Sequence, residues 1–161
     1  MKKIFTIGTS TRSSHEFFSI LNAYDIRRIL DIRRFPTSTR YPFFNRDKLN
    51  RAASSHGITY IWLGESLGGY RKGGYEKYKS TPEYREGLEK LENLGQEDTS
   101  VIVCAELLPW KCHRFQVAED LVSRGWRVIH IIDRERTWEP SPKQRQQTFV
   151  FPKNNGAKTS V

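Results

Sequence analysis

The stretch that decides the fold is residues 101–125, VIVCAELLPWKCHRFQVAEDLVSRG. It opens with an uninterrupted apolar run at residues 101–104, which is typical of a central strand in a parallel sheet. After a loop, residues 114–124 have apolar side chains at helical spacing, and Gly125 marks the end of the expected helix. A buried strand followed by an amphipathic helix is the repeating unit of a parallel α/β sheet.

The rest of the chain repeats this alternation. We expect further strands at residues 4–8, 29–32, 58–63 and 128–132. We expect helices that begin after Ser13, Asn45 and Thr81, with Gly95 ending the third. The sequence therefore predicts an α/β fold, a single domain over residues 1–137 with an open, mainly parallel sheet of about five strands and helices on both faces. Residues 138–161 turn to Pro, Gln, Lys and Asn, and we expect a basic, disordered C-terminal tail there.

The composition fits one globular domain. The chain has 161 residues, and nine Phe, seven Tyr and four Trp supply the aromatic mass of a core. No stretch approaches the ~20 apolar residues of a membrane span. The first four residues run directly into an expected strand, where a signal peptide would place an apolar run and a cleavage site. We therefore expect a cytoplasmic protein without a membrane partner.

The net charge of the chain is strongly positive. Its 27 Lys and Arg against 18 Asp and Glu leave +9, and residues 1–56 alone hold 11 basic and 4 acidic side chains. Such a balance indicates an anionic partner, with DNA, RNA or a nucleotide as the first candidates. The alternative is an arginine-rich surface that is merely solvated.

Polar side chains follow three of the expected strands. In open parallel sheets, ligands bind just beyond the carboxyl ends of the strands, so these side chains should converge on one edge. The candidate ligand-binding residues are Ser10, Arg12, Arg33, Arg34, Ser38 and Arg114, and the candidate catalytic residues are Cys104, Glu106, Cys112 and His113. We expect the arginines to hold an anion and the serines to hydrogen-bond it.

The start of the expected helix at residue 114 favours thiol chemistry. Free N–H groups and the helix dipole there stabilise an anion and lower the pKa of a thiol. Cys112 or Cys104 is then the candidate nucleophile, with His113 and Glu106 for proton transfer. We expect both cysteines to be thiols in a reducing cytosol, while a Cys104–Cys112 disulfide switch remains an alternative. Cys104 as a packed strand residue and Glu106 as an ion-pair partner of Arg114 also stay open. We expect no cofactor, because zinc at Cys104, Cys112 and His113 would lack a Cys-x2-Cys pair.

Residues 64–79 form a glycine-rich segment that interrupts the alternation. Its glycines do not lead into the Lys and Ser/Thr of a nucleotide-binding P-loop. Aromatic rings can stack on bases while cations meet phosphates, so the segment is a candidate nucleic-acid surface. Its candidate residues are Tyr70, Arg71, Lys72, Tyr75 and Lys77. The alternative is a plain surface loop.

Four segments together resemble a known family. They are Thr6-Ile7-Gly8-x-Ser10, Asp31-Ile32-Arg33-x-x-Pro36-x-Ser38, Leu67-Gly68-Gly69, and Cys104-x-Glu106 leading to Cys112-His113-Arg114. In this order they are similar to the domain of unknown function 488 family, from about residue 3 to 133. The resemblance implies a small α/β domain whose pattern includes these polar positions, without an activity that carries over.

Three functions remain open. The leading hypothesis is an enzyme, or enzyme-like domain, that acts on a phosphate-bearing ligand, a nucleotide or nucleic acid. The alternative is a non-catalytic basic module that binds nucleic acid. A third, sulfur transfer, rests on a distant similarity to rhodanese-like sulfurtransferases, which also have an Asp-x-Arg strand end, as at Asp31 to Arg33, and a Cys after a central strand, as at Cys104. The long loop with Pro109 and Trp110 departs from their short cysteine loop.

Overall fold

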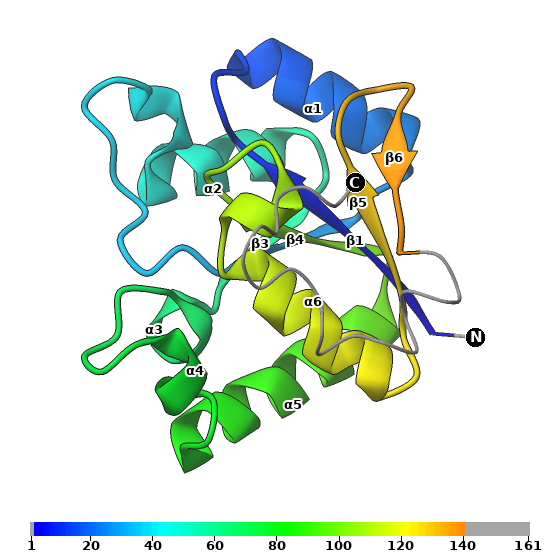
Figure 1. Ribbon diagram of the computed structural model, residues 1–161. Helices are drawn as coiled ribbons and strands as arrows, with labels where there is room; N and C mark the ends of the chain where they lie inside the picture. The colour runs from blue at the N-terminus through cyan, green and yellow to red at the C-terminus, as the bar shows by residue number, and fades with distance from the viewer. Residues whose placement is uncertain (1, 141–161) are drawn as a thin grey trace.

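Six strands form the sheet of the computed structural model, which describes residues 2–140 (Figure 1). The strands are β1 (Lys3–Gly8), β2 (Arg28–Asp31), β3 (Thr59–Trp62), β4 (Ser100–Cys104), β5 (Arg127–Ile131) and β6 (Thr137–Trp138). Their order is β3-β2-β4-β1-β5-β6, with β6 antiparallel to β5 and the others parallel. The expected α/β fold and its five parallel strands are confirmed. The sixth strand has two residues, too few to show a periodicity in the sequence.

Within the described residues, six helices connect and cover these strands. They are α1 (Ser14–Ala23), α2 (Arg46–Ser55), α3 (Gly64–Leu67), α4 (Tyr75–Tyr78), α5 (Pro82–Glu97) and α6 (Arg114–Ser123), with 3-10 turns η1 (Pro42–Phe44) and η2 (Pro109–Lys111). The Ser13 hydroxyl accepts the Glu16 N–H at 3.0 Å, as the capping box predicts. Gly95, expected to end the third helix, instead lies buried within α5. A Cβ at this position would come within 3.1 Å of the Ile4 side chain, so here the glycine permits close packing between helix and sheet.

The core lies in two layers, one on each face of the sheet. Phe5 and Ile7 of β1 pack with α1 and α2, whereas Ile4 of the same strand packs with α3, α5 and α6. The alternation along β1 follows from the two-residue period of a strand. Helices on both faces explain why β4 is buried along its whole length.

The strand order makes neighbouring connections diverge at the carboxyl edge of the sheet. β4 lies between β2 and β1, and the chain leaves these strands toward opposite faces: the connections after β1 and β2 lead to α1 and α2, and that after β4 leads to α6. In open α/β sheets ligands bind where neighbouring connections diverge in this way. The ends of β1, β2 and β4 are therefore where a site is expected.

Two expectations concern the ends and surroundings of the chain. Among residues 2–140, no helix has the length and apolar content needed to cross a membrane. The expected tail begins at residue 138, but Trp138 belongs to β6 and residues 141–161 lie outside the described part of the chain.

Candidate functional site

A cavity of about 600 Å³ lies at the carboxyl ends of β1, β2 and β4. Eight of the ten predicted ligand-binding and catalytic residues line it: Ser10, Arg33, Arg34, Ser38, Cys104, Glu106, Cys112 and His113. Small-molecule sites in proteins commonly measure 300–1,000 Å³. The prediction that ligand-binding residues lie just beyond the carboxyl ends of the strands, here called the strand-end rule, therefore places most of them at a cavity of suitable size.

The loop after β1 is held against the loop after β4. The backbone N–H groups of Thr9 and Ser10 donate to the carbonyls of Cys104 and Ala105, both at 2.8 Å. Ser10 has a φ of +50°, a conformation that non-glycine residues rarely adopt and that often occurs at functional sites. At Gly8 a Cβ would collide with the Glu106 carbonyl, so only glycine allows the two loops to approach this closely.

Arg12 and Arg114 do not line the cavity. The Arg12 guanidinium donates to the carbonyls of Gly8 and Ile132, at 2.9 and 2.7 Å. Arg114 is fully buried, and its two terminal nitrogens donate to the carbonyls of Glu106 and Leu107 at 3.1 Å. Both side chains thus tie together loops at the sheet edge. The strand-end rule locates such residues along the chain but not the direction of their guanidiniums.

The positively charged side chains at the cavity differ in whether a carboxylate of the protein balances their charge. Arg33 makes a bidentate pair with buried Asp31, at 2.9 and 2.8 Å. Burial acts to lower the pKa of Arg33, but the hydrogen bond and charge of Asp31 outweigh it and raise the pKa. Arg34 donates to the Tyr70 carbonyl at 2.7 Å and has no ion-pair partner among residues 2–140. Lys111, which also lines the cavity, likewise lacks an ion pair within the described chain.

Among the lining residues that the sequence-based prediction did not name, Lys111 and Phe35 bear most directly on ligand binding. Lys111 lies in the loop between the two cysteines, and Phe35 directly follows the arginines at the end of β2. The Phe35 ring is 62% exposed and the Tyr70 ring 84% exposed, with ring centroids 6.0 Å apart. Their position in the sequence could have indicated them, because Lys111 and Phe35 both lie in loops that follow strands, where ligands bind in such sheets.

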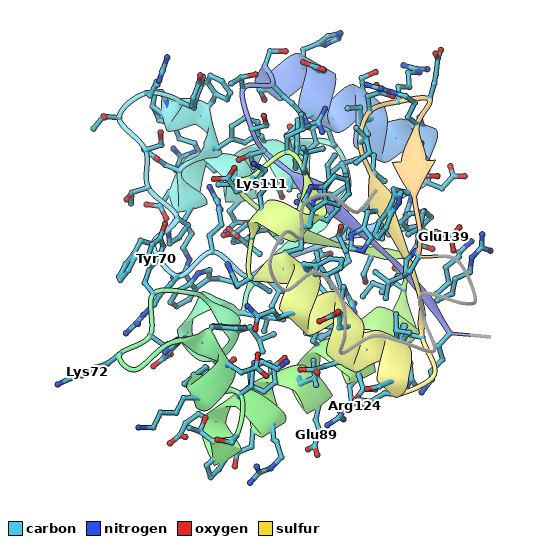
Figure 2. All side chains as sticks on the ribbon, in the orientation of Figure 1. Tyr70, Lys72, Glu89, Lys111, Arg124 and Glu139 are labelled. Carbon is cyan, nitrogen blue, oxygen red and sulfur yellow. A yellow bond between two sulfur atoms is a disulfide. The ribbon has the colours of Figure 1, made fainter. Side chains whose placement is uncertain are left out.

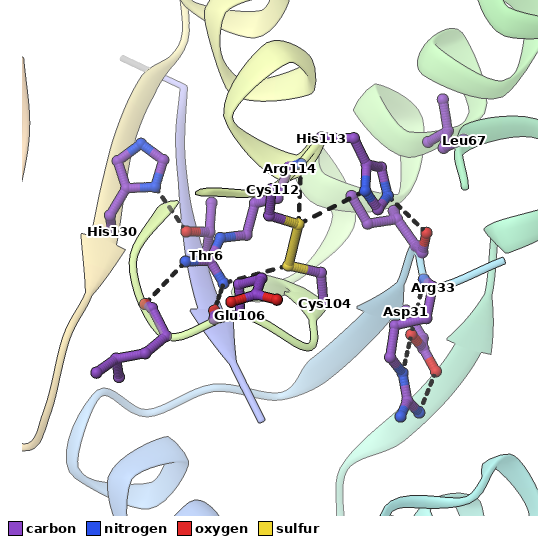
Figure 3. Close-up of a disulfide and its surroundings, with 12 residues drawn as sticks. Thr6, Asp31, Arg33, Leu67, Cys104, Glu106, Cys112, His113, Arg114 and His130 are labelled. Atoms are coloured by element: carbon purple, nitrogen blue, oxygen red, sulfur yellow. Dashed lines mark hydrogen bonds and ion pairs between the residues drawn. A yellow bond between two sulfur atoms is a disulfide. The ribbon is translucent and has the colours of Figure 1, made fainter. Parts of the chain in front are cut away.

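Cys104 and Cys112 are joined as a disulfide (Figure 3). The expectation of two free thiols is therefore wrong. The structure contains the alternative, a disulfide between Cys104 and Cys112. Cys104 ends β4 and is 1% exposed, while Cys112 is half-buried just before α6. The loop between them turns through η2 and returns to the strand end, which brings residues eight apart into contact.

His113 is oriented by two contacts. Its Nε2 lies 3.1 Å from the Ile32 carbonyl and its Nδ1 lies 3.5 Å from the Cys112 sulfur. Because a carbonyl only accepts, Nε2 carries the proton and Nδ1 of the neutral ring is an acceptor. Burial lowers the pKa of His113, and the charges of Arg114 and Arg71 add to this effect, although the Ile32 hydrogen bond opposes it. The ring is therefore a neutral base facing the Cys112 sulfur.

The residues of the candidate nucleic-acid surface differ in exposure and in hydrogen bonding. Arg71 donates to the carbonyls of Gly68 and Glu65, and the Tyr75 hydroxyl donates to the Leu67 carbonyl at 2.7 Å. Lys72 and Lys77 are exposed, and Figure 2 shows Lys72 projecting away from the ribbon. Tyr70 is exposed and lines the cavity. Of the five residues, Tyr70, Lys72 and Lys77 are exposed, whereas Arg71 and Tyr75 are half-buried.

Comparison with known proteins identifies the family. The family model described as "Domain of unknown function DUF488" matches residues 13–121. The chain belongs to this family. The matched span runs from just before α1 into α6 and includes the loops of β2 and β4 that line the cavity, so the resemblance noted in the sequence is confirmed. No curated protein and no solved structure matches the chain.

Metal-ligating side chains do not cluster in the described part of the chain. Among residues 2–140 no group of three or more His, Cys, Asp or Glu is arranged to hold a metal ion. The Cys104 and Cys112 sulfurs are bonded to each other, and Nε2 of His113 donates to the Ile32 carbonyl.

Proposed function

We propose that the protein is an enzyme that binds a phosphate-bearing small molecule, a nucleotide, in the cavity at the sheet edge and uses Cys112 as its nucleophile. The observation that supports this most directly is a cavity of about 600 Å³ whose lining includes two cations without an ion pair among residues 2–140, serine hydroxyls, the cysteine pair and a neutral imidazole. A cavity with a few convergent polar groups is the usual form of a small-molecule site.

The charges around the cavity favour an anion. Lys111 and Arg34 lack carboxylate partners among residues 2–140, and Arg33 adds a third cation whose charge Asp31 balances. Glu106 is the acidic residue among those that line the cavity. Ser10 and Ser38 add hydroxyls, the second of which already accepts the Tyr41 N–H at 2.9 Å. Phosphate oxygens would find both charge and hydrogen-bond donors here.

The rim of the cavity favours a nucleobase. Phe35 and Tyr70 are exposed next to each other, with ring centroids 6.0 Å apart, and contiguous exposed apolar surface marks binding sites. Tyr70 holds a φ of +60°, and the hydrogen bond from Arg34 to its carbonyl helps to fix it there. Stacking on an aromatic ring contributes about 1–3 kcal/mol per base. A ligand with phosphate at Lys111 and a base at the rim would use both features.

The thiol chemistry of the proposal rests on Cys112 and His113. In the reduced protein the Cys112 thiol would pass its proton to Nδ1 of His113, at 3.5 Å, and attack an electrophilic atom of the bound ligand. As the sulfur–ligand bond forms, the bond from that atom to the leaving group breaks, and the leaving group takes up the proton from His113. The Arg114 N–H at the start of α6 lies 3.4 Å from the same sulfur and would stabilise the thiolate. Glu106 is exposed at the cavity and is the candidate for the second proton transfer.

A rival proposal, a nucleic-acid-binding module, predicts a different surface. A polymer would require an extended basic face, whereas Arg71 and Tyr75 make hydrogen bonds to the protein's own carbonyls. The concave, partly aromatic cavity suits a small ligand better.

The test is binding of a panel of nucleotides to the reduced protein by calorimetry, with Lys111→Ala against Lys72→Ala. Both variants remove one exposed lysine, but only Lys111 lines the cavity. We expect Lys111→Ala to weaken binding about tenfold, which corresponds to one lost charged hydrogen bond, and Lys72→Ala to have no effect. Cys112→Ser should keep nucleotide binding and lose turnover.

Three results would refute the proposal. The first is that no nucleotide binds, and the second is that the two lysine variants weaken binding equally. The third is that single-stranded oligonucleotides bind far more tightly than nucleotides with a steep salt dependence, which would favour the nucleic-acid module.

A further inference from the structure

We propose that Cys104 and Cys112 form a redox-active pair that exchanges its disulfide with low-molecular-weight thiols, and that Arg114 is the buried counter-ion of the reduced pair. The proposal does not depend on nucleotide binding, because it concerns the sulfur atoms and the cation beneath them.

The first observation is the isolation of the Arg114 charge. The side chain is 0% exposed, and its partners are two backbone carbonyls and the Cys104 sulfur at 3.5 Å. No carboxylate forms an ion pair with it in residues 2–140, and its Nε has no hydrogen-bond partner there. Burial, together with repulsion from Arg12, lowers the pKa of Arg114 to about 9, although Glu106 acts in the opposite direction. The guanidinium is thus a charged group that lacks an anion.

The second observation is that the group in contact with this cation can itself become an anion. In the disulfide the Cys104 sulfur is neutral, and Arg114 remains unbalanced. In the reduced pair a thiolate at the same place would supply the missing negative charge. Buried charges are tolerated when paired, so Arg114 stabilises the reduced state relative to the disulfide. A pair whose reduced form is stabilised is the more oxidising one.

The third observation is that the two sulfurs differ in access. Cys104 is 1% exposed at the end of β4, whereas Cys112 is half-buried. Both residues line the cavity, and an attacking thiol would meet the more exposed of the two, Cys112. The Arg114 backbone N–H also contacts the Cys112 sulfur and would stabilise a thiolate at that position. Cys112 is therefore the exchanging cysteine and Cys104 the resolving one.

The exchange proceeds in two displacements. A glutathione thiolate attacks the Cys112 sulfur, forms a mixed disulfide and expels Cys104 as a thiolate against Arg114. A second glutathione thiolate attacks the glutathione sulfur of the mixed disulfide, which releases Cys112 as a thiolate and yields glutathione disulfide. Two electrons pass from the two glutathiones to the protein, and the protons that they lose as thiols are taken up by the cysteines or solvent.

The experiment is a redox titration of the full chain in glutathione buffers, with the thiols counted by alkylation and mass spectrometry. We expect two thiols to titrate together as a two-electron couple. Arg114→Gln should lower the equilibrium constant for reduction at least tenfold, a fall of about 30 mV in potential. The matched control is Arg28→Gln. Arg28 also donates to a backbone carbonyl and has a buried Nε without a partner in the described residues, but it begins β2, whereas the cysteines lie at the carboxyl edge of the sheet. Its potential should equal that of the wild type.

A second measurement covers the case in which Arg114→Gln does not fold. The pH dependence of iodoacetamide alkylation in the reduced wild-type chain reports the thiolate directly, and we expect an apparent pKa below about 7.5 instead of the usual 8.5. The proposal is overturned if this pKa is ordinary. It is also overturned if the two cysteines titrate independently, or if a folded Arg114→Gln variant keeps the wild-type potential.

Discussion

The buried pair of Asp31 and Arg33 offers the sharpest test of how the cavity wall is stabilised. Asp31 is 0% exposed at the end of β2 and accepts from Arg33 at 2.9 and 2.8 Å, from the Arg33 backbone N–H at 3.1 Å, and from the Tyr60 hydroxyl. Asp31→Asn keeps the size of the side chain, but it removes the charge and replaces one acceptor oxygen with an N–H donor group. Arg33, itself 9% exposed, is then left as a cation without an anion.

The magnitude follows from that uncompensated charge. Removing one partner of a buried ion pair costs about 3–5 kcal/mol, and for a chain of this length 1 kcal/mol shifts the melting temperature by roughly 2–4 °C. We therefore expect Asp31→Asn to melt roughly 6–20 °C below the wild type in calorimetry, and to show a matching loss in urea denaturation. Glu97→Gln is the control, because Glu97 is 62% exposed and Arg28 keeps its hydrogen bond to the Leu94 carbonyl, so the loss should be at most about 1 kcal/mol.

A double variant separates the lost charge from other damage. Adding Arg33→Met to Asp31→Asn removes the stranded cation, so part of the lost stability should return. The reasoning is refuted if Asp31→Asn costs less than about 1 kcal/mol, or if the double variant is less stable than the single one. Either result would mean that water or another group compensates the charge of Arg33, and that the Asp31–Arg33 pair is not shielded from solvent.

Three further predictions concern packing, pH and the cavity rim. Gly8→Ala places a methyl group against the Glu106 carbonyl, and urea denaturation should show a loss of at least about 1–3 kcal/mol. Burial raises the pKa of Glu119 from 4.5 to about 7, so stability should fall as the pH rises through that window; Glu119→Gln should match the wild type at pH 4 and exceed it at pH 8 in the same assay. Phe35→Ala should weaken nucleotide binding at least fivefold in calorimetry and leave binding of inorganic phosphate unchanged, because it removes a stacking ring and no charge.

The fold was readable from the sequence because its signals are local. The apolar run before Cys104, the capping box at Ser13 and the Pro that follows Thr81 each act within a few residues, and the structure has a strand or helix at each place. Gly95 was misread because its role is tertiary: it makes room for Ile4 and Trp126 across the helix–sheet interface. A single sequence contains no mark that separates such a glycine from a helix-ending one.

The site was only partly readable, for a related physical reason. The strand-end rule gives the position of a residue along the chain, and Ser10, Arg33 and Cys112 lie at the cavity as it requires. It does not give the direction of a long side chain, so it could not separate Arg114, which points into the protein, from Lys111, which lines the cavity. That direction depends on where the loop carbonyls lie once the fold has formed.

The placement of positive charge therefore carries more information than its total of +9. Arginines that bind internal carbonyls do not attract a ligand from solution, so the basic composition overstates the anion-binding capacity of the surface. The same burial has a second effect, because a guanidinium enclosed without a carboxylate favours whichever neighbouring group can become negative. At Arg114 that neighbour is the Cys104 sulfur, at 3.5 Å. An excess of arginine thus bears on two separate functions: the solvent-facing cations at the cavity would select an anionic ligand, and the buried one would set the redox preference of the cysteine pair beneath it.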